Sequence, residues 1–362
     1  MLKTSFLGDI SLNNKYNNYY INGLKPFSDI RKYLLQSDFV IGNLECISIG
    51  NNGENLLKKP RLNTENKTLN YLKDINITTV SLAHNHIYDN LENGFNKTIE
   101  KLKELNLDYL GAGYTKEEAN KPLILEKNSI KVAYLNYVTE DTNPNLPKEA
   151  KIYLNFFYMN KIRQNIKDIK KEVDYVVCLL HWGGRVEKGV YPDFDQPRMA
   201  YDIIDAGADL IIGHHSHTLQ PFEIYKGKYI FYSLGNFCFD DIVSDGKIFE
   251  VDNNNGCKSI IVNVEFSKEK YTISIQHIKN KNLFISLDNR KEIKQKYDRQ
   301  NKIFSIIKNK KLLWKLYWIK HKHYNPIKFY FFGNNKNPLV ELQKLKFKKI
   351  IGYILKKMKG KI

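Results

Sequence analysis

The chain has 362 residues, of which 42% are hydrophobic and 27% are charged, values that exclude a disordered protein and predict a sizeable core. Its formal net charge of +18 lies entirely in the last 72 residues, where 21 Lys and Arg accompany three acidic residues. Four dispersed cysteines without a CxxC pair indicate neither a disulfide framework nor a thiolate metal site. With no apolar run of ~18 residues and no signal peptide, we expect a cytoplasmic protein, with peripheral contact at the inner face of the membrane.

Short apolar runs alternate along the chain with segments of helical period, which is typical of layered α/β architecture. The closing segment 259–278 alternates apolar and polar residues and is predicted to complete the same domain. In chain order, the other predicted strands are 5–7, 39–41, 79–82, 130–135, 175–180, 210–212 and 229–232, and the predicted helices are 28–36, 93–105, 160–171 and 197–206.

The composition changes beyond about residue 287 to Lys, Ile, Leu, Tyr and Trp with few acids, which predicts one domain over 1–287 and a basic amphipathic extension over 288–362. Within the extension, segments 303–320 and 339–358 carry apolar residues at helical spacing with Lys between them. Such helices lie in the headgroup region of anionic bilayers. Packing on the body and binding to nucleic acid are the alternatives, and the pattern favours the membrane surface over both.

Polar clusters directly follow five of the predicted strands. In open α/β sheets the carboxyl ends of the strands gather at one rim, where ligands bind, so clusters far apart in sequence are expected to meet. They supply carboxylate, amide and imidazole donors suited to Zn, Fe or Mn, in greater number than one ion needs. Two divalent ions bridged by a carboxylate would activate a water for in-line attack on a phosphoester. The candidate metal ligands are Asp9, Glu45, Asn85, His181, His215 and His217.

The histidines are concentrated in these clusters, because six of the nine lie in three short motifs. In a locally extended loop His215 and His217 would point to the same side and form a chelate, whereas His214 would point to the other side. His214 is therefore expected to orient a ligand rather than to bind metal itself.

The motifs, in this order and spacing from about residue 4 to 240, resemble the CapA family of capsule or poly-γ-glutamate synthesis proteins. This family is part of the calcineurin-like metallophosphatase superfamily. The motifs that carry the resemblance are Gly8-Asp9, Asn43-Leu44-Glu45, the run from Ser81 to His86 with Asp89, His181-Trp182-Gly183, the run from Gly213 to His217 with Gln220, and the run from Ser233 to Phe237.

The resemblance implies a four-layer αββα sandwich with a dinuclear metal site. Asp9 would bind one ion, Glu45 would bridge the two, and Asn85 would supply an oxygen ligand at the catalytic centre. His181 and the pair His215 and His217 would complete the coordination. His86 would stand over the scissile phosphoester as general acid or charge stabiliser. Residues expected to support the ligands or to contact substrate are Asn43, Asp89, Arg185, His214, Gln220 and Asn236.

Two positions depart from the family pattern. Ser11 replaces a His that the superfamily usually has two residues after its first Asp, which leaves a mononuclear site open as an alternative. Arg185 stands where the family commonly has Glu, and it either contacts an anionic substrate or lies on a solvated loop.

The function expected from these features is metal-dependent hydrolysis of a phosphoester, or of a cell-surface polymer precursor, in capsule biosynthesis. A non-catalytic assembly or export partner of a membrane polymer synthase is the second reading. A nuclease, which the basic extension would suit, is the third.

Overall fold

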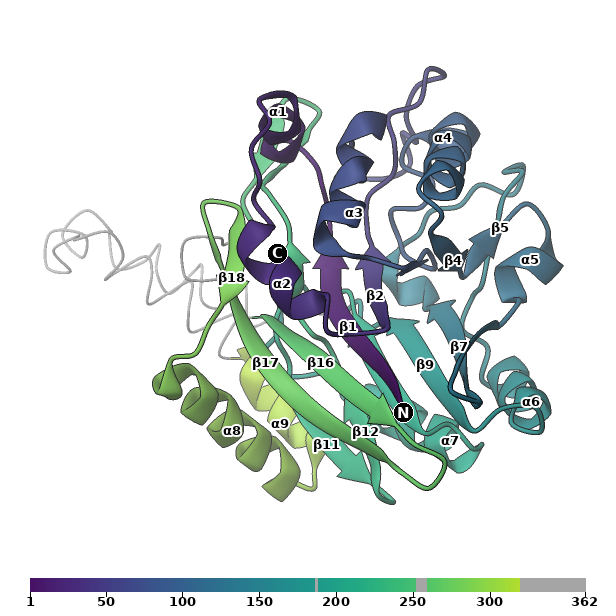
Figure 1. The fold of residues 1–362 in the computed structure, drawn as a ribbon, viewed down its shortest axis with the longest axis vertical. Helices are drawn as coiled ribbons and strands as arrows, with labels where there is room; N and C mark the ends of the chain where they lie inside the picture. The colour runs from purple at the N-terminus through teal and green to yellow at the C-terminus, as the bar shows by residue number, and fades with distance from the viewer. Residues whose placement is uncertain (186–187, 252–258, 320–362) are drawn as a thin grey trace, which may run out of the picture. The chain divides into compact units, whose positions relative to one another are not determined.

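The computed structural model describes residues 1–185, 188–251 and 259–319 (Figure 1). Two compact units make up the chain, Met1–Lys308 and Asn309–Ile362. The first unit holds both sheets and the candidate site. In the second unit, the described part is helix α9 (Lys310–Ile319).

The first sheet has eight strands in the order β18-β17-β16-β1-β2-β3-β4, with β13 also paired to β1. Strands β1 to β4 and β13 run parallel to one another, whereas β16 pairs antiparallel with β1 and continues with β17 and β18 as an antiparallel meander. The strands are β1 (Leu2–Ile10), β2 (Phe39–Leu44), β3 (Thr79–Ser81), β4 (Asp108–Leu110), β13 (Asn236–Cys238), β16 (Ser259–Phe266), β17 (Tyr271–Lys281) and β18 (Phe284–Leu287).

The second sheet has six strands in the order β11-β12-β10-β9-β7-β6. Its four central strands are parallel, and an antiparallel strand closes each edge. The strands are β6 (Leu123–Lys127), β7 (Ile130–Val138), β9 (Tyr175–His181), β10 (Leu210–His214), β11 (Phe222–Tyr225) and β12 (Lys228–Phe231).

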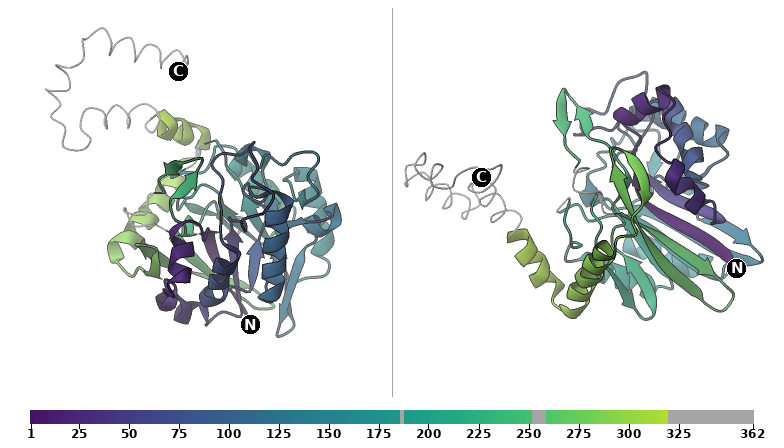
Figure 2. Two further views of the ribbon diagram at one scale, coloured as in Figure 1. Left: turned by 90° about the horizontal axis from the view of Figure 1, so that it is seen from above. Right: turned by 60° about the vertical axis from the view of Figure 1, so that its left-hand side comes forward.

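The two sheets pack face to face and carry helices on their outer faces, so the predicted four-layer αββα sandwich is confirmed (Figures 1 and 2). Between the sheets, Phe6 and Val262 of the first meet Tyr134 and Val177 of the second in one buried cluster. On the outer faces, α2 (Ser28–Leu34), α3 (Tyr71–Ile75) and α4 (Leu91–Glu104) cover the first sheet, and α6 (Met159–Ile169) and α7 (Gln196–Asp205) cover the second.

Short elements connect this framework. Helices α1 (Lys15–Ile21) and α5 (Lys116–Asn120) and two small ribbons lie in the loops. The ribbons pair β5 (Ala112–Gly113) with β8 (Tyr153–Leu154), and β14 (Ile242–Ser244) with β15 (Lys247–Phe249). Two single 3₁₀ turns occupy Asn66–Asn70 and Glu140–Thr142.

Helix α8 (Lys291–Ile306) belongs to the first unit, which therefore extends past the boundary that composition predicted at residue 287. Its Tyr297 and Phe304 are 4% and 1% exposed, and the Tyr297 hydroxyl donates to the Gln220 carbonyl at 3.1 Å.

The helix predicted over 303–320 is two helices, since residues 307–309 separate α8 from α9. The predicted helix over 339–358 lies outside the described residues. None of the helices that the structure describes is long and apolar enough to cross a membrane.

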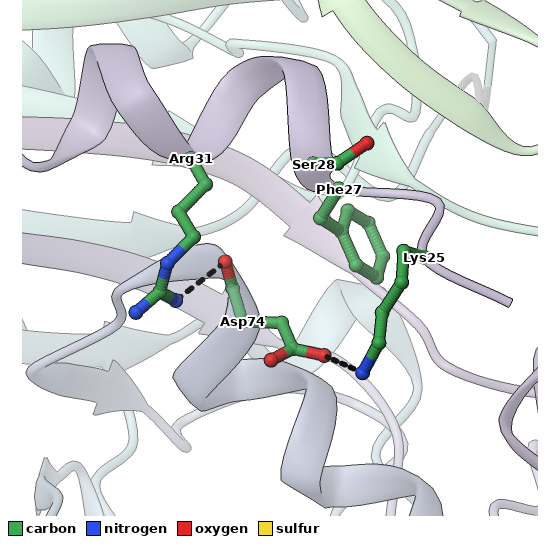
Figure 3. Close-up of a pocket in the computed structure, with 5 residues that line it drawn as sticks. All are labelled: Lys25, Phe27, Ser28, Arg31 and Asp74. Atoms are coloured by element: carbon green, nitrogen blue, oxygen red, sulfur yellow. Dashed lines mark hydrogen bonds and ion pairs between the residues drawn. The ribbon is translucent and has the colours of Figure 1, made fainter. Parts of the chain in front are cut away.

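A pocket of about 140 Å³ lies between α2 and α3 (Figure 3). Arg31 donates to the Asp74 carbonyl at 3.0 Å, and Lys25 Nζ lies 3.8 Å from the Asp74 carboxylate. Arg31 thereby satisfies carbonyls at the carboxyl end of α3, which is a structural role.

Candidate metal centre

The six predicted ligands all stand where strands end. Asp9 is the next-to-last residue of β1, and Glu45 and Asn85 follow β2 and β3, all in the first sheet. His181 closes β9, and the last two ligands, His215 and His217, follow β10, all in the second sheet. The packed sheets bring these rims together, so the six side chains form one cluster, here called the rim cluster. Five of its members are at most 5% exposed, and the His217 side chain is 15% exposed.

His181 lies at the middle of the rim cluster. Its Nε2 atom lies 2.9 Å from Asn85 Oδ1, 3.1 Å from His215 Nδ1 and 3.6 Å from Glu45 Oε1. His217 closes the other side, with Nε2 3.6 Å from Glu45 Oε1 and Nδ1 3.5 Å from Asp9 Oδ2. Donors from two sheets and more than 200 residues of sequence thus surround one small volume.

Two groups of three donors have geometry that would hold a cation. One consists of Glu45, His215 and His217, and the other of Asp9, Glu45 and His181. Within each group the ligand atoms lie within 4.8 Å of one another, and Glu45 belongs to both.

The chemistry of the rim cluster fits a divalent cation. Burial, reinforced by neighbouring imidazoles, holds the pKa of both His181 and His215 well below the usual value, so both rings are neutral and keep a lone pair. Burial alone would raise the pKa of Asp9, but its hydrogen bond to His217 and the nearby imidazoles outweigh that effect and lower it. Among the described residues, the buried Nε2 of His215 has no hydrogen-bond partner. An ionised carboxylate beside neutral imidazoles is a set of electron-pair donors that a cation would satisfy.

His86 lies beside the rim cluster and is oriented by Asp89. Its Nδ1 lies 2.6 Å from Asp89 Oδ2, and both side chains are almost fully buried. Asp89 Oδ2 also accepts the Leu62 amide at 2.7 Å, which fixes the carboxylate in turn. Burial raises the pKa of Asp89 well above its usual value. The ring of His86 is therefore held through one nitrogen by a carboxyl group that the backbone positions.

Three of the predicted supporting residues contact the ligands or their strands. Asn43 Nδ2 donates to Asp9 Oδ1 at 2.9 Å and lies 3.3 Å from His181 Nδ1, so it joins the two sheets. Asn236 Oδ1 lies 2.9 Å from His217 Nδ1. The Nε2 atom of His214 lies 3.1 Å from the Leu7 carbonyl on β1. The left-handed backbone of His215 and His217, with φ of 91° and 55°, turns both side chains toward the centre.

Arg185 and Gln220 have other partners in the described part of the chain. The Arg185 guanidinium donates to Asp195 at 2.7 Å and lies over the Phe194 ring. Gln220 Nε2 donates to the carbonyls of residues 189 and 191 and so ties down the loop that follows the second sheet's β9. The structure does not bring these two side chains to the six ligands.

Lys58 is a residue near the rim cluster that no motif indicated. It lies in the long loop after β2, where no strand end predicts its place, and it is 4% exposed. The signal that could have found it is weak: it is the first of two lysines between Leu57 and Pro60.

Comparison with known proteins agrees with this picture. Residues 3–241 match the family described as Bacterial capsule synthesis protein PGA_cap. The chain is 33% identical over 255 residues to PGA biosynthesis protein CapA of Bacillus subtilis, covering 66% of this chain and 64% of that protein. It is 25% identical over 177 residues to a probable polyglutamine synthesis accessory protein of Mycobacterium tuberculosis, covering 46% of this chain and 44% of that one. The chain thus spans less than two thirds of the length of these relatives.

Among solved structures, the chain is similar to the NAD nucleotidase of Haemophilus influenzae. The TM-score is 0.43 at 14% identity, and the match covers 82% of this chain and 55% of that one. The assignment of the fold rests on the strand order and layers described above.

Proposed function

The chain belongs to the bacterial capsule synthesis protein family, and we propose that its rim cluster is the centre of a metal-dependent phosphoester hydrolase. The reaction would serve the synthesis of a capsule or another cell-surface polymer. The observation that carries the proposal is the convergence of two carboxylates, one amide oxygen and three imidazoles at the joined rims of two sheets. Such buried convergence of ionisable groups is more typical of a functional site than of a structural core.

In this proposal the six rim residues hold one or two divalent ions, Mn, Fe or Zn. The two donor groups share Glu45, so its carboxylate would help to hold both ions of a pair. A divalent cation, when bound there, supplies Lewis-acid chemistry to the phosphoryl group. Asn43 fixes the positions of Asp9 and His181 relative to each other, because its amide contacts both side chains.

His86 would act on the leaving group. Its ring is anchored at Nδ1 by Asp89, so that Nε2 is the atom that would exchange a proton or a hydrogen bond with substrate. General acid catalysis of this kind contributes roughly 10²- to 10⁴-fold to the rate.

A second candidate is an accessory role without catalysis. The Mycobacterium tuberculosis relative carries the words "accessory protein" in its name, which favours a partner of a membrane polymer synthase. In that case the rim cluster would serve to join the two sheets, and neither bound metal nor substrate turnover would be required.

One experiment separates the candidates. The purified full chain is analysed for bound metal, and hydrolysis of bis(p-nitrophenyl) phosphate is measured with added Mn²⁺. For a hydrolase, Asp9→Ala loses metal, and His86→Ala retains metal but loses at least about 100-fold in rate. Asp168→Ala, on the exposed side of α6, is the control and keeps both properties. Metal-free and inactive wild-type protein would favour the accessory role.

We also propose peripheral contact with an anionic membrane through the basic extension. In α9, Leu312, Leu316 and Ile319 recur at i, i+4 and i+7 and are 49%, 57% and 44% exposed. Lys310, Lys311 and Lys315 lie on the same helix, which has no acidic residue. Exposed apolar groups beside lysines are typical of helices that lie in the headgroup region.

A further inference from the structure

His84 lies in the turn after β3 that also carries Asn85 and His86. Its backbone amide donates to the Leu82 carbonyl at 3.0 Å, and its side chain is fully buried, at 0% exposure. The centre of its ring lies 6.1 Å from the centre of the His181 ring, which is at the middle of the rim cluster. The His84 ring therefore lies in the wall of the proposed site, next to the six ligands but not among them.

One nitrogen of this ring accepts a hydrogen bond from the main chain. The His86 amide donates to His84 Nδ1 at 3.1 Å, so Nδ1 must present a lone pair. A neutral imidazole with its lone pair at Nδ1 carries its hydrogen on Nε2, whereas an imidazolium would turn a second N–H toward the amide hydrogen. This bond therefore fixes both the tautomer and the orientation of the ring.

The other nitrogen, Nε2, is a buried donor. Within residues 1–185, 188–251 and 259–319 it has no hydrogen-bond partner. Buried polar groups nearly always have a partner, because leaving a buried donor unpaired costs free energy. An N–H group cannot bind a cation, since its nitrogen has no free lone pair. His84 thus differs from the six ligands, because it is suited to an acceptor that enters the site and not to a metal ion.

We propose that His84 Nε2 donates a hydrogen bond to a phosphoryl oxygen of the substrate. This inference rests on the proposed function, in which the rim cluster brings a phosphoester to this wall of the site. Phosphoryl oxygens are charged acceptors, and hydrogen bonds to charged groups are stronger than those between neutral groups. Because the main chain holds Nδ1, the donor is in position before substrate binds and need not reorient as charge shifts within the phosphoryl group.

Two substitutions separate this role from a purely structural one. In His84→Asn the short side chain can keep accepting the His86 amide through its oxygen, but no atom reaches the place of Nε2. In His84→Gln the longer side chain reaches that place with an N–H donor, but the acceptor for the His86 amide is lost. A donor to substrate and a support for the His86 turn therefore predict opposite orders for the two variants.

Binding of inorganic phosphate tests the proposal without relying on turnover. The full chain is loaded with Zn²⁺, bound zinc is quantified, and phosphate is titrated calorimetrically into wild type and both variants. We expect His84→Asn to weaken phosphate binding at least about tenfold, as loss of a hydrogen bond to a charged group would. His84→Gln should retain more of the affinity than His84→Asn. Zinc content should be unchanged in His84→Asn, because His84 is not a ligand.

A measurement on wild type needs no substitution. In protein with ¹⁵N-labelled histidine, the Nε2–H resonance of His84 is assigned from the backbone resonances of its turn. We expect it to move downfield when phosphate is added to the zinc-loaded chain, because its hydrogen then enters a bond to a charged oxygen. The ring of His277, which packs against Tyr297 from β17, is the internal control and should not move.

The outcomes separate this inference from the proposed function. Wild-type protein that binds no phosphate, or His84→Asn that binds it as tightly as wild type or more tightly than His84→Gln, overturns the role of His84. So does a resonance that stays in place with phosphate, or one that zinc alone moves to its final position, because the acceptor would then be a solvent molecule. Protein that takes up no zinc, but whose His84 resonance moves with phosphate, contradicts the hydrolase and supports the contact to the phosphoryl oxygen.

Discussion

Asp89 shows how a single residue prepares the proposed site without touching the six ligands. One of its carboxylate oxygens serves both the Leu62 amide and His86 Nδ1. The residue is 1% exposed, and burial raises its pKa well above the usual value, so the carboxyl group and His86 Nδ1 share a proton away from solvent. An amide in the same position can accept the same bonds but cannot take up or release that proton.

Asp89→Asn is therefore expected to lower kcat by at least about tenfold with little change in KM or in metal content. The measurement is steady-state hydrolysis of an aryl phosphodiester, with bound metal quantified on the same samples. Asp205→Asn, on an exposed aspartate of α7 that pairs with Lys226, is the matched control. Equal loss of kcat and metal in Asp89→Asn would show that Asp89 has a structural role only.

At the scale of the elements, hydrophobic pattern was sufficient for the long strands and helices. The run 175–180 was predicted as a strand and is β9, in which Val176 and Cys178 alternate with Val177 and Leu179 and all four are buried. Fully apolar strands of this kind are typical of sheets covered on both faces, so the layered arrangement of sheets and helices could be predicted from the sequence. The convergence of the six rim residues was predicted from their places after strands, and the structure brings them together; their roles stay predictions.

Other features of the structure could not be predicted, because no local sequence pattern indicates them. Strand β13 pairs with β1 through a contact that joins residues more than 220 positions apart, and its three residues show no period. The Asp195 partner of Arg185 is likewise set by the loop after β9, which sequence does not specify. The place of α8 was missed because its many lysines resemble the extension, whereas only Tyr297 and Phe304 bury deeply.

Strand β1 positions Asp9 through a close approach that only glycine permits. A Cβ at Gly8 would lie 1.8 Å from the Gly235 carbonyl oxygen, which accepts the Asp9 amide at 3.0 Å. Gly8→Ala must push the two segments apart. We expect it to destabilise the fold by about 1–3 kcal/mol and to weaken metal binding, because Asp9 moves with the strand.

The comparison for this prediction is Gly23→Ala, measured by thermal unfolding and metal titration. Gly23 has φ of 67° but nothing within 4 Å of an added Cβ, so only a backbone cost of about 1 kcal/mol is expected, with metal binding unchanged. If Gly8→Ala bound metal as tightly as wild type, β1 would not be the element that sets the position of Asp9.

At the scale of the whole molecule, the first compact unit ends at Lys308. Composition placed the boundary at residue 287, while the compact unit runs to Lys308 and includes α8. A chain of residues 1–287 would lose Tyr297 and Phe304, and with them the Tyr297 bond to Gln220 and the Gln300 bond to the Val190 carbonyl at 2.7 Å. Burying one such aromatic side chain contributes about 1.5–3 kcal/mol. We expect the chain of residues 1–308 to melt well above the chain of residues 1–287.

The same truncation tests the membrane proposal. The extension holds the whole excess of positive charge, and each lysine near an anionic surface contributes about 1 kcal/mol to binding. Full-length protein should co-sediment with vesicles of phosphatidylglycerol and phosphatidylcholine at low salt, and the chain of residues 1–308 should stay in the supernatant.

Because the interaction is electrostatic as well as apolar, raising the salt to 0.5 M should release part of the full-length protein. Leu312→Ser with Leu316→Ser removes apolar surface but no charge, and should weaken binding at every salt concentration. Equal partitioning of full-length protein and the 1–308 chain would place any membrane contact on the folded body instead.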